Sequence, residues 1–343
     1  MELLRETFPD WAKRENALDY WKWKYGDNPN GSVIYVATSG GTIVGSNHTI
    51  LLSIKVGNRT FKGRYGDDAA THVDYRGLGI YSKMFNSTMH ELATKGNEVN
   101  YEISLSPIIV KTHLKKGRKI FPHTISHMIK VKNVNEYFKT AKIENATLKR
   151  YLFSVLKKTN WLSSSLNKHP KRGEFEIVET QLYDERIDSF YDKIKDDYYF
   201  IVERNRNYLT WRYFDHRAGR YIVKLAVIGN EVLGYCVLQV KSNGGTIEGF
   251  IADLLTLSER PDVASALIGD ACELFEKQGV DVFNYRVVKG HYYQHLASAF
   301  GFIDTRSSFP LMMDCSSSDV QKEFTLLESS SPNHAHFTYG DYY

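Results

Sequence analysis

The chain has 343 residues, 42% hydrophobic and 24% charged, which is ordinary for a globular protein and excludes disordered and collagen-like classes. Its 44 Lys and Arg residues exceed its 40 Asp and Glu residues by only four, but 16 of the basic residues lie between Pro107 and Gly173. Glu136 and Glu144 are the only acidic residues in that basic segment, whose net charge is therefore +14. At roughly 100–200 residues per domain, the length favours two domains.

The sequence predicts a reducing, cytoplasmic environment. Cys236, Cys272 and Cys315 lie far apart and form no CxxC pair, which excludes a disulfide framework. The first residues, MELLRETFPDW, lack the basic end and apolar stretch of a signal peptide. No run approaches the 18 or more apolar residues of a membrane span, so we expect none.

The first 120 residues predict alternating strands and helices. Short apolar runs around Ser39-Gly40-Gly41 and Gly57-Asn58 indicate hairpins. Apolar residues near helical spacing predict an amphipathic helix over 81–94, and a second helix begins at 108–114 and stops near Gly117. The expected strands cover residues 32–38, 42–45, 50–56, 60–64, 68–73 and 100–105.

A change of pattern after residue 130 indicates a domain boundary. Leu148, Leu152 and Val155 recur at helical spacing among lysines and arginines, and a Ser-rich stretch follows. We therefore divide the chain into a first domain (1–130), a basic helical linker (131–178) and a second domain (179–343) with a docked C-terminal tail. The aromatic tail, HAHFTYGDYY, is expected to dock as a terminal strand.

Part of the first domain recurs in the second at a constant offset of 188 residues. Trp23, Tyr25 and Gly31 match Trp211, Tyr213 and Gly219, and Lys24 matches the cation Arg212. A hairpin-like apolar stretch follows both copies. Two similar domains in tandem explain this spacing, which is too long for a solenoid.

The segment with the clearest chemistry is Asp67 to Tyr81, which is predicted as a strand, a glycine turn and a helix. Gly77 and Gly79 would let the backbone approach a phosphate, the helix N-terminus would offer unpaired N–H groups, and Arg76 would add charge. Glycines also close ordinary turns, and that reading stays open. A Walker A loop and a GxGxxG fingerprint are both absent.

The same segment resembles the signature of the Gcn5-related N-acetyltransferase (GNAT) superfamily, Arg/Gln-x-x-Gly-x-Gly/Ala. Arg76 and Gly79 match it, whereas Tyr81 stands where Gly or Ala is usual. The opening Trp21 to Tyr25 with Asn28-Pro29-x-Gly31 is also similar to such proteins. The resemblance covers residues 15–125 and, more weakly, 180–315. It implies an α/β fold of two tandem GNAT-like domains, each a mixed, largely antiparallel sheet flanked by helices.

The resemblance also implies where an acyl-CoA would bind. The cofactor would lie in a V-shaped opening between the strands at 68–73 and 100–105. Its pantetheine arm would pair with the backbone of Thr71, His72 and Val73. Its pyrophosphate would rest on Arg76, Gly77, Leu78, Gly79, Ile80, Tyr81 and Ser82.

Direct attack of an amine on the thioester needs a base and, less strictly, an acid for the thiolate. The family's usual acid is a Tyr four residues before the Gly of a closing Gly-Phe; here Gly117 precedes Arg118, and His113 stands at that position. His113 is therefore the candidate acid, the alternative being a surface histidine beside the lysines at 115–119. Asp68 and His72 are the candidate bases, because strand alternation places them on one face. Asp68 could equally cap a turn or pair with Arg64.

The second domain repeats the fold without the chemistry. Residues 251–261 have no glycine where the phosphate turn would recur, although Phe300-Gly301-Phe302 resembles the closing Gly-Phe. We interpret this domain as a degenerate copy that shapes the substrate cleft or a homodimer surface. The spaced histidine pairs 123/127 and 334/336 have no accompanying Cys or carboxylate in a ligand pattern, so no metal is predicted.

The leading hypothesis is an acyl-CoA-dependent N-acyltransferase, in its simplest form an N-acetyltransferase using acetyl-CoA. Its acceptor would be the primary amine of a small molecule such as an amino sugar or amino acid. Two alternatives stay open: a tRNA-dependent aminoacyl-transferase of the peptidoglycan-bridge type, and a non-catalytic acyl-CoA-binding module. The basic segment would suit RNA, but most of it falls on the inferred linker, so we expect no nucleic-acid partner.

Overall fold

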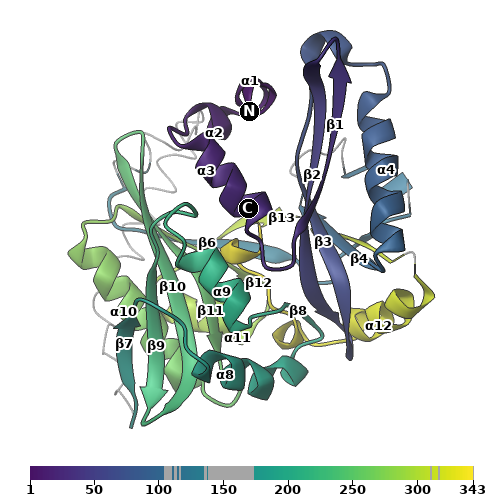
Figure 1. The fold of residues 1–343 in the computed structure, drawn as a ribbon. Helices are drawn as coiled ribbons and strands as arrows, with labels where there is room; N and C mark the ends of the chain where they lie inside the picture. Colours follow the sequence, from purple (N-terminus) through teal and green to yellow (C-terminus); the bar gives the residue numbers. More distant parts are fainter. Residues whose placement is uncertain are drawn as a thin grey trace.

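Two seven-stranded sheets, each flanked by helices, form the part of the chain that the structure describes (Figure 1). The computed structural model describes residues 1–103, 110–111, 114–115, 117–134, 137, 174–309, 311–315 and 317–342. His113 and most of the basic segment lie outside these residues. The expected α/β architecture with two mixed, largely antiparallel sheets is confirmed.

The first sheet has the order β1-β2-β3-β4-β14-β5, with β8 paired to β2. Residues 46–49 are polar, which is why the sequence suggested a break there, but they are buried inside one continuous strand. The side-chain amide of Asn47 donates to the Thr88 hydroxyl at 2.9 Å, which satisfies its hydrogen-bonding need there. The strands are β1 (Ser32–Ser39), β2 (Thr42–Val56), β3 (Arg59–Thr71), β4 (Val99–Ile103), β5 (Lys119–Ile120), β8 (Phe200–Val202) and β14 (Leu311–Asp314).

Helices cover both faces of this sheet (Figure 1). The helix expected over 81–94 is confirmed as α4 (Ile80–Thr94), which buries Met84, Thr88 and Leu92 on one face. The other face carries α1 (Glu2–Thr7), α2 (Pro9–Ala12), α3 (Ala17–Trp21) and the π-helical turn η1 (Lys22–Gly26).

The second sheet has the order β13-β6-β12-β11-β10-β9-β7. Alternate residues of β10 face opposite ways: Cys236 and Leu238 pack in a core with α10, whereas Tyr235 and Val237 pack in a core with α8 and α9. The strands are β6 (Ile125–Val131), β7 (Glu176–Thr180), β9 (Ile222–Ile228), β10 (Glu231–Asn243), β11 (Thr246–Thr256), β12 (Val282–Val288) and β13 (Ile303–Phe309). The helices of this half are α8 (Arg186–Ile194), η3 (Lys195–Asp197), α9 (Arg206–Tyr213), α10 (Pro261–Lys277) and α11 (Tyr292–Ala299). The last helix, α12 (Ser318–Glu328), packs against β2 of the first sheet.

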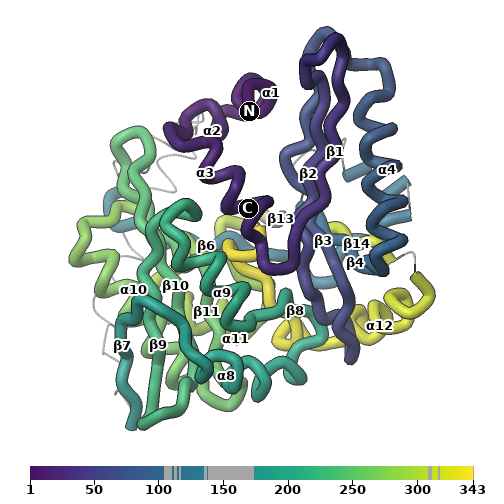
Figure 2. Tube along the Cα trace, viewed as in Figure 1, coloured from purple at the N-terminus to yellow at the C-terminus, as the bar shows by residue number. Residues whose placement is uncertain are grey.

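The two sheets exchange strands. β6 lies early in the chain but pairs between β12 and β13 in the second sheet. β14 lies near the end of the chain but pairs with β4 and β5 in the first sheet, where Figure 2 shows it beside β4. The sequence-based division at residues 130 and 178 stays a prediction, and in space each sheet contains a strand from the other half of the chain.

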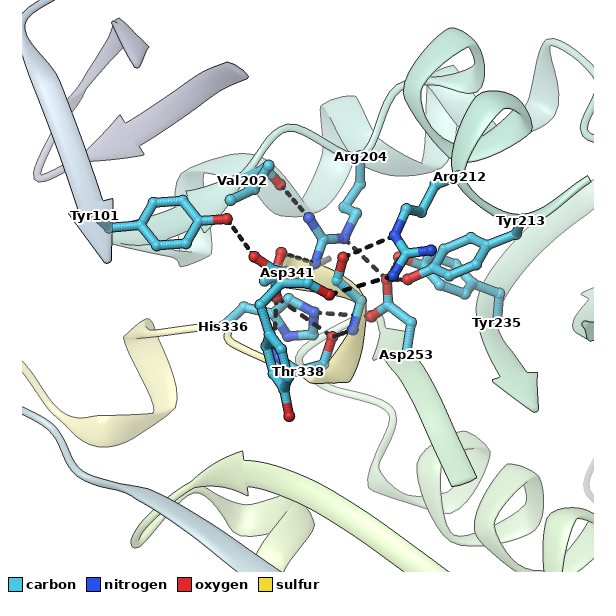
Figure 3. Close-up of polar contacts among 12 residues, drawn as sticks. Tyr101, Val202, Arg204, Arg212, Tyr213, Tyr235, Asp253, His336, Thr338 and Asp341 are labelled. Atoms are coloured by element: carbon cyan, nitrogen blue, oxygen red, sulfur yellow. Dashed lines mark hydrogen bonds and ion pairs between the residues drawn. The ribbon is translucent and has the colours of Figure 1, made fainter. Parts of the chain in front are cut away.

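The C-terminal tail docks between the sheets, but the prediction of a terminal strand was wrong. The tail forms the short 3-10 helices η4 (Pro332–His334) and η5 (Tyr339–Asp341), joined to β8 by a single bridge at Ala335. Arg204, fully buried, contacts Asp253 of β11 at 3.0 Å and Asp341 of the tail at 2.6 Å (Figure 3). The Tyr101 hydroxyl of β4 donates to the Asp341 carbonyl, so the tail is bound to both sheets.

The two tryptophans that the internal repeat aligns make a reciprocal contact. The Trp23 indole N–H donates to the Trp211 carbonyl, and the Trp211 indole N–H donates to the Trp23 carbonyl, each at 2.8 Å. The two rings stack with centroids 5.2 Å apart. Trp23 and Trp211, which occupy matching positions in the two copies, are therefore in direct contact, and this contact joins the two halves of the chain.

This contact generates a stability prediction. Replacing Trp23 or Trp211 by Phe removes one indole donor and should lower the free energy of unfolding by about 1–3 kcal/mol. Because the two residues stack, the double variant should cost less than the sum of the singles by at least about 0.5 kcal/mol. Urea unfolding followed by circular dichroism measures these energies. Strictly additive losses would contradict the coupling.

Candidate functional site

The central feature of the first sheet is the separation of β3 from β4. These parallel strands pair only from Gly63–Val99 to Tyr65–Tyr101. Beyond that pair, the register between β2 and β3 shifts at Ser46/His48, and Asp68 adopts a φ of 42°. Left-handed backbone is uncommon for a residue other than glycine, and a β-bulge bends its strand. Among the described residues, β3 and β4 therefore pair only up to Tyr65–Tyr101, and the predicted V-shaped opening would lie beyond that pair.

Side chains from the N-terminal helices hold this bulge in place. The Asp68 carboxylate accepts hydrogen bonds from the Trp11 indole and the Lys24 ammonium, both at 2.9 Å, and from the Tyr25 hydroxyl. The Trp21 indole donates to His48 Nε2 at 3.0 Å, so the His48 proton is on Nδ1, which lies 3.1 Å from the Asp68 carbonyl oxygen. Burial lowers the pKa of His48, which keeps the ring neutral.

A buried lysine separates two consecutive carboxylates at the bulge. Lys24 Nζ lies 2.6 Å from Asp67 and 2.9 Å from Asp68, and its side chain is only 3% exposed. Burial alone would lower the pKa of Lys24, but Asp67 and Asp68 raise it above its ordinary value. Burial raises the pKa of Asp67 to about 6, against the effect of Lys24. Burial alone would also raise the pKa of Asp68, but the Lys24 charge and the Tyr25 hydrogen bond hold that pKa below the usual range.

The glycine turn follows at the upper end of β3. His72 caps the short 3-10 helix η2 (Val73–Tyr75), and the Arg76 guanidinium donates to the Thr71 carbonyl at 3.2 Å. Gly77 and Gly79 have φ values of 82° and 74°, which explains the need for glycine, and α4 begins directly after Gly79. A Cβ at either position would meet no atom within 4 Å. The turn therefore presents exposed backbone and the N-terminus of a 15-residue helix.

The structure brings most of the proposed residues to one opening. Thr71, His72, Val73 and residues 76–82 lie at its end, and Asp68 lies at the bulge. His72 is half-buried, 4.0 Å from Glu6, and His113 lies outside the described residues. Sequence reasoning missed Asp67 and Lys24, because strict alternation places Asp67 and Asp68 on opposite faces. The bulge turns both carboxylates toward Lys24, and no sequence signal links that lysine to residues more than 40 positions away.

The second sheet contains a comparable separation that is filled. β11 and β12 pair in parallel only as far as Ile251–Tyr285. Above that pair, the Tyr292 and Tyr293 hydroxyls lie 3.2 and 3.0 Å from the Thr256 hydroxyl. The helix after β11 begins with Pro261, and an Arg260–Asp262 ion pair stands at its start.

Among the described residues, no group of three or more His, Cys, Asp or Glu side chains has the arrangement of a metal site. His336 contacts Asp253 instead, at 3.1 Å, and His127 contacts Asn284 at the same distance. None of the described helices is long and apolar enough to cross a membrane.

Comparison with known proteins agrees with this geometry. Residues 1–112 match the family model of the acetyltransferase (GNAT) domain. No curated protein sequence matches the chain.

Solved structures extend the likeness to the rest of the chain. A GCN5-related N-acetyltransferase from Anabaena variabilis is similar at 11% identity and a TM-score of 0.62, over 92% of this chain and 69% of that one. A probable N-acyltransferase from Enterococcus faecalis is similar at 12% identity and a TM-score of 0.63, over 92% of this chain and 68% of that one. Saccharomyces cerevisiae N-myristoyltransferase with bound myristoyl-CoA is similar at 9% identity and a TM-score of 0.53, over 80% of this chain and 67% of that one. The resemblance read from the sequence is therefore confirmed, and the chain has a GNAT-like fold.

The lysine between the two carboxylates generates the second prediction. Lys24→Met leaves Asp67 and Asp68 side by side without a buried counter-ion, and should lower the free energy of unfolding by about 3–5 kcal/mol at pH 8. The loss should shrink near pH 5, where Asp67 is protonated. Chemical unfolding at both pH values measures it. The matched control is Lys22→Met on the same helical segment, an exposed residue 3.9 Å from Asp19 whose loss should cost under about 1 kcal/mol. Equal losses for the two variants would contradict the prediction.

Proposed function

We propose that this chain, whose residues 1–112 match a GNAT domain, is an acyl-CoA-dependent N-acyltransferase. The observation that carries the proposal is the open separation of β3 and β4, which ends in the Gly77–Gly79 turn at the start of α4. A thioester arm fits between separated strands, whereas in the second sheet tyrosines fill the equivalent place. Acetyl-CoA or another acyl-CoA is the cosubstrate, and the first sheet supplies the site.

The turn and helix start suit the cofactor's pyrophosphate. The exposed glycines let phosphate oxygens approach backbone N–H groups, and the positive end of the α4 dipole favours an anion there. Arg76 is exposed beside the turn and adds positive charge. The pantetheine arm would run down the opening along Thr71, His72 and Val73 toward the bulge.

The Asp67 and Asp68 carboxylates at the bulge are suited to act at the thioester end of the acyl-CoA. The acceptor nitrogen attacks the thioester carbonyl, the C–N bond forms, the C–S bond breaks and CoA leaves as a thiolate. The acceptor's proton needs a base, and Asp67, with a pKa of about 6, is ionised at neutral pH and still basic enough to take it. Asp68 is the weaker candidate because three donors already engage its carboxylate. His72 remains an alternative base, and His113 remains the proposed acid for the thiolate.

The acceptor is proposed to be the primary amine of a small molecule such as an amino sugar or amino acid. Two carboxylates beside the reacting end favour a cationic ammonium group over an anionic acceptor. The second half of the chain packs against the same face of the first sheet through Trp211 and the docked tail, so it would close the acceptor side.

The third prediction tests the phosphate end. Calorimetric titration with acetyl-CoA should show binding, and Arg76→Glu should weaken it by at least about tenfold through repulsion of the phosphates. The charge-reversal control Lys322→Glu changes an exposed residue of α12 and should leave binding unchanged. If neither acetyl-CoA nor another CoA thioester bound, the proposal would be overturned. Salt-sensitive binding of tRNA in its place would favour the aminoacyl-transferase alternative.

The fourth prediction tests the base. If Asp67 accepts the proton, kcat/KM with a reactive amine should rise with pH through about 6, because the carboxylate works only when ionised. Asp67→Asn should lower kcat by about 100-fold and remove this inflection. The exposed Asp10→Asn serves as control. An inflection that survives in Asp67→Asn but disappears in His72→Gln would assign the role to His72.

A further inference from the structure

A buried arginine that forms no ion pair with any of the described residues lies next to the last pair of β3 and β4. Arg64 of β3 is directly opposite Asn100 of β4, one pair below the last pair, Tyr65–Tyr101. Residues that are opposite in a parallel pair share a face, and Arg64 points to the α4 side, where its guanidinium is 6.0 Å from the Phe85 ring. Arg64 is 4% exposed and Asn100 is 2% exposed.

The polar contacts of Arg64 leave its charge uncompensated. Its hydrogen bond is to the Met89 sulfur, a weak acceptor, and no carboxylate of the described residues lies within 4 Å of it. The neighbouring Arg118 pairs with Glu102 at 2.5 Å. Burial and the Arg118 charge lower the pKa of Arg64 to about 10, against the more distant effects of Asp314 and Glu102. Buried charges in proteins are normally paired, so this one calls for an anion.

Asn100 is a second buried group without a partner. Both the nitrogen and the oxygen of its side-chain amide are inaccessible to solvent and make no hydrogen bond. Leaving such groups unsatisfied costs about 1–3 kcal/mol each. A ligand with acceptor oxygens would engage the Arg64 guanidinium and the Asn100 amide N–H groups together.

Among the described residues, Gly66 leaves room beside the Arg64 guanidinium. Gly66 is two residues beyond Arg64 on the same face, and it is the first residue of β3 past the last pair with β4. A Cβ at Gly66 would meet only Arg64 Nη1, at 3.8 Å. From Arg64 to Thr71 the strand rises by about 20 Å. Arg64 therefore lies at the opposite end of the opening from the glycine turn, where the acyl group rather than the phosphates would arrive.

We propose that Arg64 and Asn100 bind a carboxylate at the end of the acyl chain, so that the acyl donor is a short dicarboxylic acyl-CoA such as succinyl-CoA. The inference rests on the proposed function and specifies its donor. The planar guanidinium matches a carboxylate with two hydrogen bonds, whereas an acetyl group offers it no charge. The carboxylate takes no part in the bond changes; it positions the thioester.

Binding calorimetry with CoA, acetyl-CoA and succinyl-CoA tests this inference. The unmodified protein should bind succinyl-CoA at least tenfold more tightly than acetyl-CoA. Arg64→Met, which keeps the length of the side chain without its charge, should abolish the preference. The matched control is Arg59→Met on the same strand, where the exposed arginine pairs with Asp319 and the preference should persist. Gly66→Ala adds one methyl group to the space and should reduce the preference without affecting acetyl-CoA.

The outcomes separate this inference from the proposed function. Equal affinities for the two thioesters, or a preference unchanged in both Arg64→Met and Gly66→Ala, would overturn the donor assignment and leave the acyltransferase proposal standing. If no CoA thioester binds, both fall. Free succinate should not compete at micromolar concentrations; tight binding of succinate without any thioester preference would identify a separate carboxylate site and overturn the acyl assignment. If the Arg64→Met variant does not fold, the Gly66→Ala variant alone tests the donor assignment: a reduced preference for succinyl-CoA supports it, and an unchanged preference overturns it.

Discussion

The ion pairs of Lys24 with Asp67 and Asp68 are the constraint on which the first sheet depends. An ammonium group in a buried position is stable only with counter-charges, and two carboxylates in one strand need a cation between them. Their mutual requirement fixes the left-handed Asp68, and that residue bends β3 away from β4. The place proposed to receive a thioester would thus be a consequence of charge pairing at the bulge, where the N-terminal helices supply Trp11, Lys24 and Tyr25.

The second half of the chain uses the same device for a different purpose. Tyr213, which matches Tyr25 in the repeat, donates to Asp253 at 3.0 Å, as Tyr25 donates to Asp68. A register shift again stands beside the aspartate, between Val237 and Leu238. Here, however, the cation is Arg204, which also contacts Asp341 and so fixes the tail (Figure 3). One copy of the bulge leaves a site open, and the other copy anchors the chain end.

The sequence predicted the fold well where local chemistry decides it. The sequence predicted the glycine turn at Gly77 and Gly79, helix α4 and the match between Trp23 and Trp211. Glycine, helical spacing and tryptophan each have strong local signatures. Three features were not readable. The buried polar run at 46–49 resembles a loop, and the bulge at Asp68 breaks the alternation by which faces are assigned. The exchange of β6 and β14 depends on pairing across more than 150 and more than 200 residues, respectively. Each of these is decided by tertiary contacts that no local pattern encodes.

The strand exchange has a consequence for how the protein is made. The first sheet lacks the strand between β4 and β5 until residues 311–314 have left the ribosome, so its edge at β4 stays unpaired during most of synthesis. An unpaired edge is a template for wrong pairing, and contacts between distant residues form slowly. The first sheet is therefore complete only after nearly the whole chain has been made, and its native form depends on both halves of the chain.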